Sequence, residues 1–177
     1  MLGRTNFYRI AITMKTAFLD IETTGLSPNY DEITVIGLYI EENEKCKIIQ
    51  LVEDSICANN LILALKNVDL VYTYNGKRFD LPFIKAKLDV DIAARYKHND
   101  LMYYCHRCDL YGGLKVVEKR LGIRRKLPDI DGIIAVQLWY EYQRGSKKAF
   151  QTLLEYNRED VLNLKLLLCK LNQFIPE

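Results

Sequence analysis

The segment Thr16–Glu22, with the sequence TAFLDIE, most constrains what this chain can fold into. Its compact apolar run is typical of a strand covered on both faces, yet Asp20 lies within it. An ionised carboxylate is costly to bury without a partner. Side chains alternate along a strand, so Asp20 and Glu22 share a face, where their like charges repel. Most acidic residues are solvated surface groups, and that interpretation stays open, but a bound cation would resolve both problems.

A second acidic residue interrupts an apolar helix face near the end of the sequence. The helical period places one stripe toward the core, formed by Ala149, Leu153, Tyr156, Asp160, Leu164 and Leu167. Tyr156 lies one turn before Asp160, so its hydroxyl and the carboxylate can approach the same point. Two interpretations follow: a private hydrogen bond between Tyr156 and Asp160, or a role for both at a functional site.

A third acidic residue, Asp80, lies at the start of a helix predicted from Phe79 onward, with Pro82 in its first turn. Asp is favoured at helix starts, so capping alone could explain it. However, the β-rich run 69–74 comes directly before it, which places the carboxylate at the carboxyl end of a strand. Ligand sites in open α/β sheets tend to form there.

Other catalytic constellations find little support. The two histidines, His98 and His106, have no nucleophile elbow nearby, and neither a Walker A loop nor a G-x-G-x-x-G fingerprint is present. Cys105-x-x-Cys108 lacks the second pair that a zinc site needs, so incidental thiols on a helix are favoured over redox or metal use. Carboxylates without His or Cys suit Mg²⁺ or Mn²⁺.

Length and composition indicate one α/β domain. The chain has 177 residues, 49% of them hydrophobic and 27% charged, which excludes a disordered protein. Met14 is a candidate start, so we expect an N-terminal extension over 1–14 and one domain over 15–177. No apolar run is long enough for a membrane span, and we expect a cytoplasmic protein. Beyond the first strand, the pattern predicts strands at 33–41, 46–52, 69–74 and 98–102, and helices at 55–66, 113–122, 132–143 and 147–172. Ser55 is the candidate cap of the first of these helices.

Three segments together resemble the motifs of the DEDD (DnaQ-like) 3′–5′ exonuclease superfamily. They are FLDIETTGL (18–26), YTYNGKRFDLP (72–82) and YNREDV (156–161). The second resembles the version in the proofreading domain of family B DNA polymerases, and the third has the Tyr-x-x-x-Asp form of the DEDDy type. Residues 98–101 and 129–132 resemble the YprB-like branch of ribonuclease-H-like domains. The resemblance spans about residues 15–172.

This resemblance implies a ribonuclease-H-like fold: a five-stranded mixed sheet of order 3-2-1-4-5, with strand 2 antiparallel, flanked by helices. It implies two divalent cations, Mg²⁺ or Mn²⁺, held by Asp20, Glu22, Asp80 and Asp160, with Tyr156 positioning the attacking water. Thr23, Thr24 and Leu26 would contact the 3′-terminal nucleotide, and Asn75 and Phe79 would line the path of the strand. Lys77 and Arg78, beside the second motif, are candidate phosphate contacts.

The function implied is 3′–5′ exonuclease activity on single-stranded or frayed DNA or RNA ends, with replication or repair proteins as candidate partners in trans. A ribonuclease-H-like endonuclease and a non-catalytic nucleic-acid-binding module are the alternatives. The net charge of +2 does not by itself indicate a nucleic-acid binder. A basic stretch opposed only by Glu118 either holds phosphates or forms a solvated face; it contains Lys115, Lys119, Arg120, Arg124, Arg125 and Lys126.

Overall fold

The computed structural model describes residues 14–43 and 45–173, and five strands form its sheet. They are β1 (Thr16–Thr23), β2 (Ile33–Glu42), β3 (Lys45–Val52), β4 (Leu70–Thr73) and β5 (Lys97–Asp100). Their order is β3-β2-β1-β4-β5. β2 runs antiparallel to β1 and β3, while β4 pairs in parallel with β1 and β5. The predicted strand order and the antiparallel second strand are confirmed.

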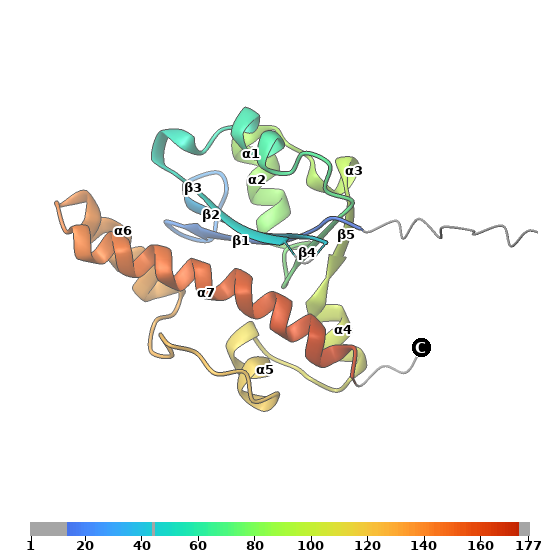
Figure 1. Cartoon of the computed structure of the whole chain (residues 1–177). Helices are drawn as coiled ribbons and strands as arrows, with labels where there is room; N and C mark the ends of the chain where they lie inside the picture. The colour runs from blue at the N-terminus through green and yellow to red at the C-terminus, as the bar shows by residue number, and fades with distance from the viewer. Residues whose placement is uncertain (1–13, 44, 174–177) are drawn as a thin grey trace, which may run out of the picture.

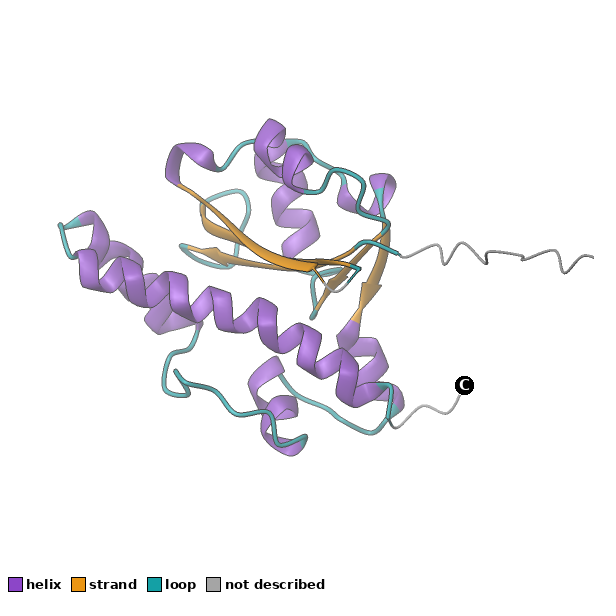
Figure 2. Cartoon of the chain, in the orientation of Figure 1, coloured by secondary structure: helices purple, strands orange, loops and turns teal. Residues whose placement is uncertain are grey.

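Helices cover both faces of this sheet (Figure 2). They are α1 (Ala58–Ala64), α2 (Asp80–Leu88), α3 (Ile92–Arg95), α4 (Leu101–Arg107), α5 (Leu114–Arg120), α6 (Gly132–Gln143) and α7 (Lys147–Leu171), with a 3₁₀ turn η1 (Glu53–Ser55) after β3. In Figure 1, α1 and α2 lie on one side of the sheet and the long helix α7 crosses the other.

The alternation of β1 decides which side chains meet α7. Leu19 and Ile21 belong to a buried cluster with residues of α1 and α2, whereas Phe18 packs with Leu164 and Leu167 of α7. Successive side chains of a strand point to opposite faces, so the even-numbered residues of β1 face α7. Asp20 and Glu22 therefore lie on the α7 side of the sheet.

The amphipathic stripe of α7 packs on that face as the sequence predicts. Ala149, Leu153, Leu164 and Leu167 are all buried, and Asp160 is buried among them. The helix begins after Ser146, whose Oγ accepts a hydrogen bond from the backbone N of Ala149 at 3.2 Å. Packing the apolar stripe therefore carries Asp160 into the interior.

Ser55 is not the helix cap that the sequence predicts. Its hydroxyl bonds to the backbone of Val52, donating to the carbonyl oxygen at 2.5 Å and lying 2.6 Å from the amide nitrogen. This local turn uses the hydroxyl, so the helix begins later, at Ala58, and ends at Ala64.

The predicted strand 98–102 also ends early, at Asp100. The carboxylate of Asp100 accepts a hydrogen bond from the backbone N of Met102 at 3.1 Å and so caps α4.

The predicted extension over 1–14 falls almost wholly outside the described residues, and the domain assignment stays a prediction. Within the described ranges, no helix is both long and apolar enough to cross a bilayer.

Candidate metal centre

Three carboxylates from distant parts of the chain converge where β1 meets α7. One ligand oxygen each from Asp20, Glu22 and Asp160 lies within 4.8 Å of the others. β1 supplies the first two because they are two residues apart on its α7-facing side. Asp160 completes the group from the middle of α7. This convergence places three of the four predicted ligands around one point.

Asp80, the fourth predicted ligand, approaches the group from α2. It is 4% exposed, and its Oδ1 accepts a hydrogen bond from the backbone N of Ile21 at 3.1 Å. The cap residue of α2 is Phe79, so Asp80 is the first residue of the helix rather than its cap. Asp80 therefore ties the start of α2 to β1 and shares a cavity with the three clustered carboxylates.

The electrostatics of the cluster favour a positive partner. Burial, followed by the charge of Asp160, raises the pKa of Asp20 and of Glu22 well above the ordinary values. Burial also raises the pKa of Asp80 to about 7 and that of Asp160 to about 6. Glu22 Oε1 is buried with no hydrogen-bond partner among the described residues. An all-oxygen donor set with an unused buried oxygen fits a hard divalent cation such as Mg²⁺ or Mn²⁺.

Asn157 orients Asp20 through a contact that the sequence pattern does not predict. Its Nδ2 donates to Asp20 Oδ2 at 3.2 Å, while its Oδ1 accepts from Gln50 Nε2 at 3.0 Å. Gly37 of β2 lies opposite Asp20 of β1 on one side and opposite Gln50 of β3 on the other. A Cβ on Gly37 would lie 2.2 Å from Asn157 Oδ1, so the absence of a side chain there leaves room for this link.

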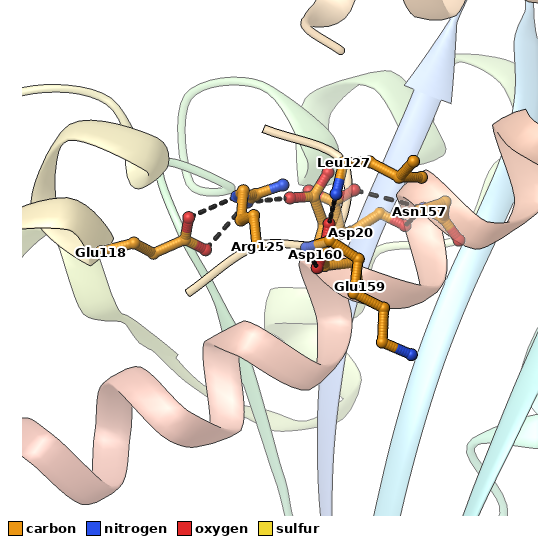
Figure 3. Close-up of polar contacts among 8 residues, drawn as sticks. Asp20, Glu118, Arg125, Leu127, Asn157, Glu159 and Asp160 are labelled. Atoms are coloured by element: carbon orange, nitrogen blue, oxygen red, sulfur yellow. Dashed lines mark hydrogen bonds and ion pairs between the residues drawn. The ribbon is translucent and has the colours of Figure 1, made fainter. Parts of the chain in front are cut away.

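Arg125 pairs with two buried carboxylates on the other side of the cluster (Figure 3). Its Nη2 donates to Glu118 Oε1 at 2.8 Å and to Asp160, and its Nε donates to the second oxygen of Glu118. The Arg125 side chain is only 4% exposed, and its Nη1 has no hydrogen-bond partner within the described part of the chain. Burial opposes the charged guanidinium, but both carboxylates outweigh it and raise the pKa of Arg125.

The segment that carries Arg125 is fastened to α7. Glu159 accepts hydrogen bonds from the backbone N of Lys126 and, at 3.1 Å, from that of Leu127 (Figure 3). The basic stretch in the sequence thus has three kinds of member. Arg125 forms a buried ion pair, Lys115 is half-buried, and Lys119, Arg120, Arg124 and Lys126 are exposed.

Tyr156 is buried beside Asp160, with a strongly hindered ionisation. Burial and the charge of Asp160 raise the pKa of its phenol far above the ordinary value. Lys115 Nζ lies 4.8 Å from the centroid of the Tyr156 ring. Among the described residues, no hydrogen bond joins Tyr156 to Asp160, which pairs with Arg125 instead. The interpretation of a private Tyr156–Asp160 hydrogen bond is therefore not supported.

A cavity of about 580 Å³ opens in front of these side chains. Besides the four acids and Tyr156, its lining includes four of the predicted substrate contacts: Thr23, Leu26, Asn75 and Phe79. Leu26 is 85% exposed, so its side chain is free to meet a ligand.

The other three predicted contacts lie elsewhere. Thr24 Oγ1 accepts a hydrogen bond from the backbone N of Glu32 at 2.9 Å and does not line the cavity. Lys77 and Arg78 are exposed and also lie outside its lining.

The Cys105-x-x-Cys108 pair has a structural setting. Cys105 is fully buried in the cluster with Phe18, Leu164 and Leu167, and burial raises the pKa of its thiol to about 12. A thiol this reluctant to ionise is a poor metal ligand or nucleophile, which favours the interpretation as incidental thiols.

Comparison with known proteins supports the fold assignment. A sequence model of the RNase H superfamily matches residues 17–172. The uncharacterized protein YprB of Bacillus subtilis (strain 168) is 26% identical in an alignment 163 residues long, which covers 83% of this chain and 39% of YprB. The chain therefore spans about two fifths of the length of this curated relative.

Two solved structures share the fold. NrnC of Brucella melitensis, solved with bound pGG, has a TM-score of 0.62 and 22% identity over 97% of this chain and 76% of NrnC. The family B DNA polymerase of the archaeon Pyrobaculum calidifontis has a TM-score of 0.66 and 15% identity, over 90% of this chain and 24% of the polymerase. The resemblances predicted from the sequence motifs, to YprB-like domains and to family B polymerases, are confirmed.

Proposed function

This chain belongs to the RNase H superfamily, and we propose that it is a metal-dependent 3′–5′ exonuclease of the DEDDy type. It would hydrolyse phosphodiester bonds at single-stranded or frayed nucleic-acid ends and release nucleoside monophosphates. The observation that carries this proposal is the convergence of Asp20, Glu22 and Asp160 within 4.8 Å, beside Tyr156 and Asp80.

The acidic residues would hold the cations. Asp20, Glu22 and Asp160 form the common point, and Asp80 lines the same cavity as a further ligand. A pair of divalent cations, when bound, supplies activation of the attacking water and neutralisation of charge at the leaving 3′-oxygen. A structure of the fold neighbour NrnC with bound Mg²⁺ is consistent with this choice of ion.

Tyr156 would orient the attacking water rather than take its proton. Its phenol is protonated at every working pH because burial and neighbouring carboxylates raise its pKa. A neutral hydroxyl can donate one hydrogen bond and accept another. Tyr156 therefore suits positioning of a water molecule at the edge of the carboxylate cluster.

The terminal nucleotide would occupy the 580 Å³ cavity. Leu26 and Phe79 offer apolar surface to a base, while Thr23 and Asn75 offer polar groups to the sugar and phosphate. NrnC binds pGG, a short single-stranded nucleic acid, which supports the same substrate class here.

The test is degradation of matched DNA and RNA oligonucleotides labelled at the 5′ end, with Mg²⁺, Mn²⁺ or a chelator. A ladder shortening from the 3′ end is expected with either ion, no product with chelator, and none from Asp20→Asn. A single internal cut would favour the endonuclease instead. Oligonucleotide binding without cleavage under any condition would favour the non-catalytic module.

A further inference from the structure

A second, larger cavity lies along β5, at the edge of the sheet. This groove has a volume of about 950 Å³ and shares no lining residue with the candidate metal centre. α2 and α3 contribute one part of its lining and α4 another, with β5 between them. β5 pairs only with β4 within the described sheet and is therefore an edge strand.

The groove is positively charged. Lys77, Arg95 and Lys97 line it, are exposed, and form no salt bridge with any residue that the structure describes. Its two acidic residues are already engaged. Asp91 pairs with Lys85 at 2.6 Å, and the buried carboxylate of Asp100 accepts from backbone N–H groups. Three cations therefore remain available to an anionic ligand.

Aromatic side chains stand among these cations. Tyr103 of α4 is exposed, and Lys77 Nζ lies 6.0 Å from the centroid of its ring. Tyr96 and Tyr104 also contribute to the lining. Proteins bind single-stranded nucleic acid by combining a positively charged groove, which follows the phosphate backbone, with aromatic side chains on which the bases stack.

One short loop connects the groove to the candidate metal centre. In the segment between β4 and α2, Asn75 and Phe79 line the smaller cavity, whereas Lys77 lines the groove. Asp100 fixes this loop, since its carboxylate accepts from the backbone N of Asn75 at 2.7 Å and of Lys77 at 3.0 Å. Asn75 has a positive φ of 60°, a conformation that Asn tolerates better than most residues.

The distance between the two sites suits a continuous ligand. β1, β4 and β5 are parallel neighbours, and the pairing sets Asp100 level with Thr73 of β4. Because Phe18 pairs with Tyr72, Thr73 and Asp100 are level with Leu19, the β1 residue before Asp20. At about 4.8 Å per strand spacing, the backbone of Asp100 is therefore roughly 10 Å from that of Leu19. A chain that leaves the smaller cavity can therefore cross the loop at Lys77 and enter the groove.

We propose that this groove binds the part of a single-stranded nucleic acid that lies 5′ of the terminal nucleotide. Lys77, Arg95 and Lys97 contact its phosphates, and Tyr103 stacks on a base. The inference rests on the proposed function, because the 3′ end must occupy the candidate metal centre. Binding in the groove makes the affinity for a substrate depend on its length.

The test compares a short and a long substrate in the variant Arg95→Gln/Lys97→Gln. Its matched control is Lys147→Gln/Lys148→Gln, which removes the same charge from two exposed residues at the distant start of α7 (Figure 1). Fluorescence anisotropy with Ca²⁺ in place of Mg²⁺ measures the affinity for a 5′-labelled dinucleotide and for an oligonucleotide of about ten nucleotides, the range of such sites. DNA and RNA of the same sequence are used in parallel.

We expect the groove variant to lose about tenfold in affinity for the long strand and to bind the dinucleotide as the wild type does. Its salt dependence on the long strand should fall by roughly 1.4 in log–log slope, or about 0.7 for each lost phosphate contact. Tyr103→Ser should weaken long-strand binding at least about fivefold, the lower end of one lost stacking contact. The control should match the wild type on both ligands.

Equal losses on both lengths, or the same loss in the control, would overturn the groove inference while leaving the proposed exonuclease intact. Binding of neither length by the wild type would overturn both. Cleavage assays with Mg²⁺ further separate the groove inference from the proposed function, since the groove variant should cleave the dinucleotide at the wild-type rate.

Discussion

Arg125 donates a hydrogen bond from its guanidinium to the carboxylate of Asp160, 35 residues later in the chain. Both side chains are almost fully buried, and Glu118 accepts from the same guanidinium. Asp160 therefore has a cationic partner within the protein before any external cation binds. This pairing and the crowded carboxylates around it lead to five predictions.

Arg125→Gln should lower the free energy of unfolding by about 3–5 kcal/mol, because it leaves two buried carboxylates without a cation. Urea unfolding with chelator measures the loss. Arg124→Gln is the matched control, since this exposed neighbour should change stability by no more than about 0.5 kcal/mol. Equal stability of the two variants would show that the buried pair carries no net stabilisation.

Asp20→Asn should abolish the rise in melting temperature that Mn²⁺ gives the wild type, together with cleavage. Without metal, the variant should be at least as stable as the wild type, because it removes a carboxylate that burial and Asp160 disfavour. Differential scanning fluorimetry with and without Mn²⁺ tests both statements. Asp54→Asn, an exposed change of the same kind, should keep the Mn²⁺ response. Persistence of that response in Asp20→Asn would argue against Asp20 as a ligand.

The stability of the metal-free protein should depend on pH through Asp80. Its pKa rises from 3.8 to about 7 in the folded protein, so the folded state retains a proton that the unfolded state loses. The contribution of this proton to the free energy of unfolding is therefore complete below pH 3.8 and is lost as the pH rises to about 7. Asp80→Asn should therefore become more stable relative to the wild type across this window. A constant difference between the two in urea unfolding at several pH values would contradict the raised pKa.

Tyr156→Phe should reduce the cleavage rate about 100-fold, the scale of losing one preorganised hydrogen-bond donor. The shape of the pH–rate profile should be unchanged, because the phenol does not ionise in the working range. The Mn²⁺-induced rise in melting temperature should also be retained. Tyr111→Phe, an exposed tyrosine, serves as control. A wild-type rate that rises with pH, with this rise lost in Tyr156→Phe, would instead identify the phenol as a base.

Gly37→Ala should destabilise the protein by about 1–3 kcal/mol, since the new methyl group would displace Asn157. The loss of the Asn157–Asp20 hydrogen bond should also weaken Mn²⁺ binding, measured by titration calorimetry. For stability, Gly132→Ala is the control: a Cβ there meets no atom within 4 Å, and the residue lies in α6. If Gly37→Ala changed the free energy of unfolding no more than Gly132→Ala does, Asn157 would have moved aside without loss of stability.

The elements that carry the site could be predicted because their burial patterns are local. Asp20 and Glu22 lie within an apolar strand, and Asp160 lies within the apolar stripe of a helix. The alternation of side chains along a strand and the helical period therefore show that all three face the core. The order of the strands came from the resemblance of the three motifs to a known superfamily.

The partners of these residues could not be predicted in the same way. Gly37, Gln50 and Asn157 meet only through the register of three strands under α7, which no local pattern encodes. Arg125 is one of six basic residues in a short stretch, and only the tertiary fold distinguishes it from its solvated neighbours. The predicted cap at Ser55 was wrong because its hydroxyl closes a turn with Val52.

The helix that supplies Asp160, α7, is also the last described element of the chain. A ribosome makes Asp20 and Glu22 more than a hundred residues before it reaches Asp160, so a nascent chain holds an incomplete cluster throughout that interval. The carboxylates can meet only after α7 has emerged and docked across the sheet. The growing polypeptide would thus lack the complete carboxylate cluster until the segment that forms α7 had been translated.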